Sequence, residues 1–500
     1  MSSVSAGALG LGSRSLAFRG LLAWQGLTFA LLAVGLAIAL FVPIPDTSWL
    51  LIVAERVLHG QRLYSQVIEV NPPLSVLLYE PAVMLADALG LKPDPVAGGL
   101  CMLGVLVSLG LSGAILRPLI GDDPLRGWKL AAAGAFALAV LPAAAFGERE
   151  HIAVMALLPF VASTVLRAEG RRLHWAFAVL VGLGLGLAVA IKPHFAAVAG
   201  LPALWAMWKS RSFRPWAQLE LWIGALVFGG YAAWALVAYP NYLADFMPVL
   251  RDVYLPVRTS FAEMVTLPSI PAAVAGYAVA RLLKLERRWM AAPMLAALGG
   301  GVAYLVQGKG WPYHAYPMLA FTALGLLGPV AMVPPAKAGA WTRLDRFMLL
   351  FPSLVAVWWL ASYRDPGQLA RQVAAVAPPS PRLISITGNL GIGIPLVPAL
   401  DGVWVGSTHS DWVSEGALRR EERGGLDPAT RARLDRLIDQ DRSRLAHDIQ
   451  VGRPDVILVE HKKFDWRGWA LKNPLIASEF THYRFAGKVR EVEVWARTRG

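Results

Sequence analysis

Eleven apolar runs divide the sequence, and each is about as long as a helix needs to cross the hydrocarbon core of a membrane, about 30 Å thick. Hydrophobic residues make up 56% of the 500 residues and charged residues only 16%, whereas soluble proteins carry about 25% charged residues. The composition excludes a disordered or fibrous chain, and the single cysteine, Cys101, excludes an intramolecular disulfide. The sequence therefore predicts an α-helical polytopic membrane protein. The runs lie at about 21–42, 97–116, 130–146, 152–166, 174–191, 194–208, 217–239, 267–283, 289–306, 315–333 and 347–361.

A further apolar stretch at 72–91 begins with two prolines and contains two acidic residues, and the distribution of Lys and Arg indicates its position. If the N-terminal tail is cytoplasmic and 72–91 does not cross, the tail and the cytoplasmic loops carry 18 Lys and Arg. The outer side up to residue 361 then carries 8. Basic residues are enriched in cytoplasmic loops, and a crossing at 72–91 would invert this bias. We therefore expect 72–91 to lie against the outer leaflet.

The basic balance of the chain, with a formal net charge of +13, orients it in the membrane and does not indicate a nucleic-acid partner. No basic cluster with interleaved aromatic residues is present in the sequence. The first apolar run is too long for a secretion signal and lacks a convincing cleavage site, so we expect it to remain as a span.

The composition changes after about residue 362, where 17 of the 34 acidic residues are found. Alternation and apolar runs predict strands and a hairpin, and helical spacing predicts one long helix. We therefore expect a membrane domain at 1–361 and a small α/β domain at 362–500, which eleven spans place outside the membrane. The expected elements are strands at 382–387, 403–405 and 455–460, a helix at 428–449, and a hairpin at 482–495 that turns at Ala486 and Gly487.

Polar residues of five loops share the outer side in this topology. Ionisable groups against a membrane are costly and usually functional, and short loops place these groups at the ends of spans. We therefore expect one cavity at the outer membrane boundary. Its polar residues are Asp46, Glu69 and Asn71 in the first loop, Glu148, Arg149, Glu150 and His151 in the second, Lys192 and His194 in the third, Arg251 and Asp252 in the fourth, and Lys309, Tyr313 and His314 in the fifth.

These residue types suit the transfer of a group from a phosphate. A carboxylate such as Asp46 can act as general base for a hydroxyl. The cations Arg149, Lys192 and Lys309 suit a phosphate leaving group, because its developing negative charge needs fixed partners.

Each residue also has a structural interpretation that the sequence leaves open. Asp46 could cap a helix, and Glu69 and Asn71 could cap the helix that begins near Pro72. The remaining alternatives are an ion pair of Arg149 with Glu148 or Glu150, and interfacial anchoring by Lys192, His194, Lys309 and His314.

The first outer loop resembles the signature of integral-membrane glycosyltransferases of the C superfamily, which transfer a sugar from a polyprenyl-phosphate carrier outside the membrane. The resemblance lies in the order of the parts and covers about residues 20–170. It is closest to the branch that contains aminoarabinose transferase and the protein O-mannosyltransferases, many of which end in an extracytoplasmic domain. The parts are a first span, Asp46, an amphipathic stretch, Gly60-Gln-Arg62-Leu-Tyr64, and Asn71-Pro72-Pro73-Leu74.

The resemblance implies an inverting transfer in which Asp46 is the base or orients the acceptor. A further acid in the second outer loop of the family corresponds here to Glu148 or Glu150. No pair of acids follows the first span, so the metal-using relatives that transfer oligosaccharides fit less well. We therefore expect no cofactor, with a divalent metal as the alternative. A zinc site would have to draw on His59, His151, His194 and His314, whose separation offers no local ligand spacing.

The sequence thus predicts a glycosyltransferase that moves one sugar from a polyprenyl-phosphate donor, such as an undecaprenyl-phosphate donor, to a lipid, glycan or protein acceptor. It would lie in the cytoplasmic (inner) membrane, with its C-terminal domain periplasmic or extracellular. The alternatives are a transporter or flippase for a lipid-linked or anionic substrate and a polysaccharide polymerase. The predicted catalytic residues are Asp46, Glu148 and Glu150, and the predicted substrate-binding residues are Glu69, Asn71, Arg149, His151, Lys192, His194, Lys309, Tyr313 and His314.

Overall fold

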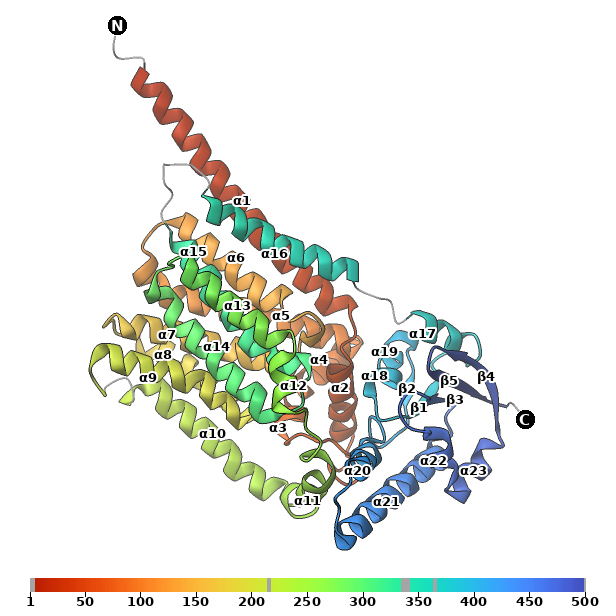
Figure 1. Cartoon of the computed structure of the whole chain (residues 1–500). Coiled ribbons are helices and arrows are strands. Elements are labelled where there is room, and N and C mark those ends of the chain that lie inside the picture. Colours follow the sequence, from red (N-terminus) through yellow and green to blue (C-terminus); the bar gives the residue numbers. More distant parts are fainter. Residues whose placement is uncertain (1–4, 214–216, 334–341, 363–366, 499–500) are drawn as a thin grey trace. The chain divides into compact units, whose positions relative to one another are not determined.

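A computed structural model describes residues 5–213, 217–333, 342–362 and 367–498, and they form two compact units (Figure 1). The first unit comprises the described parts of 1–42, 98–234 and 259–362. The second comprises the described parts of 43–97, 235–258 and 363–500. The boundary expected at 361–362 adjoins residues 363–366, which lie outside the described residues.

The first unit consists of apolar helices, and each of the eleven apolar runs is helical. Seven helices in the described part of the chain are long and apolar enough to cross a membrane, which defines a multi-pass membrane protein. The seven are α1 (Ser5–Phe41, apolar from Arg19), α5 (Pro93–Ile120), α7 (Arg149–Ala168), α10 (Leu219–Ala238), α14 (Arg287–Gln307), α15 (Tyr316–Met332, extended by the 3-10 turn η7, Pro312–Ala315) and α16 (Arg343–Ser362).

The other four apolar runs form shorter helices, and backbone breaks end three of them. They are α6 (Pro124–Ala135), which continues into the π-helical turn η1 (Phe136–Val140), α8 (Trp175–Ile191), α9 (Ala196–Ser210) and α13 (Ser269–Leu282). Pro193 separates α8 from α9 through the 3-10 turn η3 (Pro193–Phe195). After η1 the chain reaches Ala143, which has a φ of 55°. These breaks place polar loops at the ends of the helices.

Glycines let helix α14 approach two of its neighbours closely. A Cβ atom at Gly299 would lie 2.3 Å from the carbonyl oxygen of Ala197 in α9. A Cβ atom at Gly300 would lie 2.6 Å from the backbone nitrogen of Met318 in α15. Small residues at helix crossings are the usual means of close packing within membranes, where lipid is as apolar as leucine.

Buried ion pairs join the helices of the first unit. Arg167 of α7 donates two hydrogen bonds to the carboxylate of Glu220 in α10, each 3.0 Å long. Lys129 of α6 is paired with Asp345 of α16, and both side chains are buried. A charge removed from water is tolerated when it is paired and hydrogen-bonded, so these residues have a structural explanation.

In the second unit, the chain from Pro43 to Ala97 folds into short helices. They are α2 (Pro45–Leu58), α3 (Leu74–Leu77) and α4 (Glu80–Leu89). The longest helix within 72–91 has ten residues and therefore extends about 15 Å, half of what a membrane crossing needs. This agrees with the expected juxtamembrane position of 72–91.

The C-terminal domain is built on a five-stranded sheet in the order β2-β1-β3-β5-β4. Strands β1, β2 and β3 are parallel, while β5 runs antiparallel to β3 and to β4. The expected strands and the long helix are confirmed. The strands are β1 (Arg382–Ile386), β2 (Val403–Trp404), β3 (Val456–Glu460), β4 (Tyr483–Val489) and β5 (Val492–Arg497). The helices are α17 (Gly367–Ala374), α18 (Leu390–Gly393), α19 (Leu396–Leu400), α20 (Trp412–Arg423), α21 (Pro428–Gly452), α22 (Trp466–Leu471) and α23 (Pro474–Phe480).

The turn of the β4–β5 hairpin differs from the expected one. Val489 pairs with Val492, so the turn consists of Arg490 and Glu491, and the expected turn at Ala486 and Gly487 is wrong. Gly487 has a φ of 136° and lies where the register of the strands shifts. A glycine among alternating residues marks either a turn or a bulge, and here it marks the bulge.

Hydrogen bonds attach the first and fourth outer loops to the C-terminal domain. The backbone N–H of Ile68 donates to the carbonyl of Ser407 over 2.8 Å, and Arg56 of α2 donates to the carbonyl of Gly406 over 2.7 Å. Arg420 of α20 donates to the carbonyl of Asp252 over 2.5 Å. These contacts require the two loops and the C-terminal domain to lie on the same side of the membrane, as an odd number of spans predicts.

Two buried carboxyl groups lie beside each other in the C-terminal domain. Asp411 accepts a hydrogen bond from the backbone N–H of Thr387 (2.9 Å), and Asp441 accepts from the hydroxyl of Ser414 (2.8 Å). Burial, together with the neighbouring carboxyl of Asp441, raises the pKa of Asp411 well above its ordinary value. The positive charge of Arg444 acts to lower the pKa of Asp411 but does not outweigh these effects. Asp411 therefore retains its proton in the folded domain at a pH where the unfolded chain has lost it.

We predict that Gly299→Ala lowers the stability of the protein, because the new Cβ atom would overlap the carbonyl of Ala197. Overpacking of this kind costs about 1–3 kcal/mol. Thermal unfolding in detergent, followed by intrinsic fluorescence, should give a lower Tm than wild type. The matched control is Gly229→Ala in α10, where no atom lies within 4 Å of the added Cβ. Equal Tm values for the two variants would contradict this packing.

We also predict that the C-terminal domain becomes less stable as the pH rises. The raised pKa of Asp411 means that the folded state binds more protons than the unfolded state, so stability is lost between about pH 4 and the raised value. Hydrogen exchange of β1, corrected for intrinsic rates, should show less protection at about pH 8 than at about pH 5. Asp411→Asn should flatten this difference. Asp439→Asn, at an exposed carboxylate paired with Arg442, should leave it as in wild type.

Candidate functional site

Residues of three outer loops meet around the carboxylate of Glu150 in the first unit. Glu150 lies in the first turn of α7 and is fully buried. Its Oε1 atom accepts a hydrogen bond from Lys192 Nζ, and His314 Nε2 lies 3.6 Å from the same oxygen. Lys192 also donates to the side-chain oxygen of Gln307 over 2.8 Å. Gln307 begins the fifth outer loop, and the sequence alone predicted no role for it.

Further predicted cations and a histidine lie in the same cluster. His314 interacts electrostatically with Lys192, Arg149, His194 and Lys309. Arg149 and His314 are both buried, with exposed fractions of 3% each. The second, third and fifth outer loops therefore contribute to one polar cluster, as expected for loops that share one side of the membrane.

The fifth loop places an aromatic edge next to this cluster. The rings of Tyr313 and His314 meet edge to face with their centroids 4.3 Å apart. Trp311 stacks on Tyr313 at 5.7 Å. The backbone of the loop is held by Thr259, whose hydroxyl donates to the carbonyl of Lys309 over 3.0 Å. Aromatic faces beside fixed cations can bind a sugar ring next to its phosphate.

His151 lies in the core of the first unit, and its environment indicates a structural role. The backbone N–H of Gly147 donates to its Nδ1 over 3.0 Å, so the Nε2 carries the proton and lies 2.8 Å from the carbonyl of Leu138. Its ring packs against Phe146 and Tyr316 at 4.7 and 5.5 Å. Glu148 is also buried, with 5% of its surface exposed, at the residue that precedes α7.

The residues predicted in the first loop belong to the second unit, where Glu69 organises its neighbours. Glu69 is buried and accepts a hydrogen bond from Trp49 Nε1 over 2.6 Å on one oxygen. Its other oxygen accepts from the backbone N–H of Asn71 over 3.0 Å and from the Asn71 side chain. These bonds orient Trp49 and Asn71, so the structure favours a positioning role for Glu69 over helix capping.

Asp46 is partly buried in the first turn of α2 and does not cap it. The residue at the cap position is Ile44, which has no polar side chain, and Pro45 begins the helix. The first turn of a helix stabilises a negative charge, because unpaired N–H groups and the helix dipole point toward it. This position therefore favours the ionised carboxylate that a general base requires.

Contacts of Tyr64 stabilise the segment Gly60-Gln-Arg62-Leu-Tyr64 of the first loop. The backbone of Tyr64 has a φ of 67°, an unusual value for a residue other than glycine. Its hydroxyl donates to the carbonyl of Asn71 over 2.7 Å, and its ring lies 4.8 Å from that of Tyr242 in the fourth loop. The strained backbone is thus stabilised by contacts at both ends of the side chain.

Within the described part of the chain, no three His, Cys, Asp or Glu side chains are arranged as ligands of a metal ion. His59, one of the four histidines considered for zinc, is exposed and its Nδ1 lies 2.8 Å from the carbonyl of Glu55 in its own helix. The nitrogens of His151 are both in hydrogen-bonding contacts. The described residues thus provide no zinc ligand set from these histidines.

Comparison with solved structures places this architecture among known folds. The chain resembles the crystal structure of ArnT from Cupriavidus metallidurans bound to undecaprenyl phosphate, with 15% identity, a TM-score of 0.53, and coverage of 95% of this chain and 97% of that one. It also resembles ArnT from the same organism in the apo state, with 14% identity, a TM-score of 0.58 and coverage of 99% of both chains. No family model matches the sequence, and no curated protein matches it.

The fold is therefore ArnT-like along nearly the whole length of the chain. The fold class expected from the first loop is confirmed. It combines apolar spanning helices, juxtamembrane helices and a small C-terminal α/β domain.

We predict that Lys192→Met destabilises the protein by about 3 kcal/mol, because it leaves the Glu150 carboxylate buried beside His314 without its cation. The double variant Glu150→Gln/Lys192→Met should lose much less than the sum of the two single losses. Reversible denaturation in mixed micelles measures both. The control is Lys209→Met, which breaks a more exposed pair with Glu169 and should cost less than about 1 kcal/mol. Additive losses in the double variant would show that Glu150 and Lys192 are not coupled.

Proposed function

We propose that this protein transfers a sugar from a polyprenyl-phosphate donor to an acceptor hydroxyl or amine outside the cytoplasmic membrane. The observation that carries the proposal is the convergence of Arg149, Lys192 and Lys309 around His314 in an ArnT-like fold. One of the two ArnT structures is bound to undecaprenyl phosphate, a ligand of the class that such cations would bind.

The cations would stabilise the phosphate as it leaves. When the bond between the sugar and the phosphate breaks, negative charge grows on the phosphate oxygens. Fixed donors in a site of low dielectric constant stabilise that charge more than water does, because they need no reorganisation. Glu150 and Gln307 hold the ammonium group of Lys192 from two directions. In this proposal Glu150 positions Lys192, and the buried Glu148 remains a candidate second acid.

Asp46 would accept the proton of the acceptor. The acceptor oxygen or nitrogen attacks the anomeric carbon from the side opposite the phosphate and forms the new glycosidic bond. The bond from that carbon to the phosphate oxygen breaks, and its electron pair leaves with the polyprenyl phosphate. The acceptor proton passes to the Asp46 carboxylate in the first turn of α2. This single displacement inverts the anomeric configuration.

The location of the reaction follows from the topology in this proposal. The C-terminal domain and the first loop lie on the same side, and the bias of Lys and Arg assigns that side to the outside of the cytoplasmic membrane. A lipid-linked donor suits this location, because its polyprenyl chain keeps it in the bilayer. The acceptor would be a lipid, a glycan or a protein.

We predict that Asp46→Asn lowers kcat by about 10²- to 10⁴-fold, the usual contribution of a general base. KM for the donor should change little, since Asn keeps the size and polarity of the side chain. The measurement is transfer of labelled sugar from a polyprenyl-phosphate donor to membrane acceptors in proteoliposomes. The control is Glu55→Gln, an exposed acid of the same helix, which should retain wild-type rates.

Two outcomes would contradict the proposal. Unimpaired transfer by Asp46→Asn would remove Asp46 from the chemistry. Movement of the intact donor across the vesicle membrane without cleavage of its sugar–phosphate bond would indicate a transporter.

A further inference from the structure

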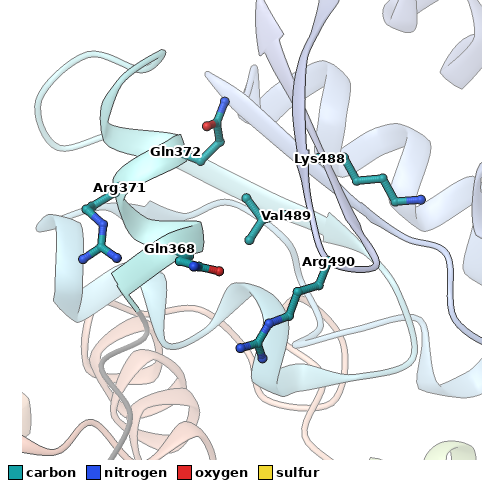
Figure 2. A pocket seen from close by; sticks show the side chains of 6 residues that line it. All are labelled: Gln368, Arg371, Gln372, Lys488, Val489 and Arg490. Carbon is teal, nitrogen blue, oxygen red and sulfur yellow. The ribbon is translucent and has the colours of Figure 1, made fainter.

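A basic pocket lies in the C-terminal domain between helix α17 and the turn of the β4–β5 hairpin (Figure 2). It has a volume of about 380 Å³. Three of the six residues that line it are cationic, and no acidic side chain lines it among the residues that the structure describes. The lining residues are Gln368, Arg371 and Gln372 from α17 and Lys488, Val489 and Arg490 from the hairpin.

The pocket has a defined construction. Gln368, Arg371 and Gln372 lie three and four residues apart, so they occupy one face of α17. Gln372 donates a hydrogen bond to the carbonyl of Ala486 over 2.7 Å, which joins α17 to the hairpin. A Cβ atom at Gly487 would lie 2.8 Å from the Gln372 side-chain nitrogen. The bulge glycine is therefore what permits this approach of helix and hairpin.

The turn of the hairpin holds Arg490 in an unfavourable backbone conformation that places its side chain at the pocket. Arg490 has a φ of 53°, where Asn or Gly costs least. With Asn or Gly in place of Arg490, the same two-residue turn could connect the two strands. A residue held in an unfavourable conformation is often held there for function, and here the conformation places a guanidinium at the pocket (Figure 2).

The charges and hydrogen-bond donors of the lining residues favour a phosphate group as the ligand. Arg371, Lys488 and Arg490 provide three positive charges, and two of them are guanidinium groups that can hold two oxygens at once. Two glutamines add neutral donors. In the sequence, α17 begins five residues after α16 ends at Ser362. Basic groups near a membrane surface attract anionic lipid headgroups.

We propose that this pocket binds the phosphate group of an anionic ligand, either a lipid headgroup or a soluble phosphate. The site is separate from the residues assigned to sugar transfer, and the inference does not depend on the transfer reaction. Its ligand is recognised through phosphate oxygens, with Arg371 and Arg490 as paired donors and Lys488 as a third charge.

The test compares two triple variants of the full-length protein in an uncharged detergent. Arg371→Gln/Lys488→Gln/Arg490→Gln removes the three charges of the pocket. Arg431→Gln/Arg436→Gln/Lys472→Gln removes three exposed charges elsewhere on the same domain. Native mass spectrometry counts bound phosphatidic acid against phosphatidylcholine. We expect the pocket variant to lose about tenfold or more of its affinity for phosphatidic acid, and the control variant to bind as wild type does.

A second arm identifies the source of the phosphate. Inorganic pyrophosphate is titrated into lipid-free protein by calorimetry. Binding of phosphatidic acid that depends on the pocket supports a lipid headgroup. Binding of pyrophosphate alone, lost in the pocket variant, supports a soluble phosphate. If neither probe distinguishes wild type from the pocket variant, or if both triple variants lose binding equally, the proposal is overturned.

A single variant separates ligand binding from folding. Arg490→Asn removes one charge and places at the turn a residue that accepts positive φ more readily. We expect an unchanged or higher Tm together with weaker binding of the phosphate probe. Retained affinity in this well-folded variant would exclude Arg490 from the site and overturn the proposed donor pair.

Discussion

The architecture of the polar cluster depends on the buried contact between Glu150 and Lys192. Removing either charge from water is costly, and the pair is tolerated because Gln307 and His314 complete its surroundings. The contact joins the start of α7, the loop after α8 and the fifth outer loop. It fixes the direction of an ammonium group and connects three helix ends, so stability and the proposed chemistry rest on the same atoms.

In the second unit, side-chain contacts position the first loop. Glu69 accepts hydrogen bonds from Trp49 and Asn71, while Tyr64 contacts the fourth loop. A backbone hydrogen bond from Ile68 then attaches the loop to the C-terminal domain. The C-terminal domain therefore supports the loop that carries Asp46, and this gives a physical reason for its presence in a membrane protein.

The sequence was sufficient to place the apolar helices and most strands, because apolar length and alternation depend on local composition. It predicted eleven spans, whereas seven helices of the described residues are long and apolar enough to cross a membrane. It also predicted that Glu150, Lys192 and His314 would meet, since topology alone puts their loops on one side. It could not separate His151 from Glu150, because both are buried in the first turn of α7 and only the structure shows that Glu150 pairs with Lys192 while His151 bonds to the backbone. The position of the hairpin turn could not be predicted from Gly487 either, because a glycine with positive φ is typical of both a bulge and a turn.

The attachment of the first loop to the C-terminal domain has a consequence for biosynthesis. Arg56 and its hydrogen-bond partner Gly406 are 350 residues apart in the chain. At the usual rate of translation the ribosome needs roughly 20 to 70 s to make the intervening segment. The loop is thus synthesised well before its hydrogen-bond partner, which follows 350 residues later. A nascent chain that stops before the sheet is complete leaves this loop without its support, so only molecules that contain the sheet can acquire the arrangement of α2 described above.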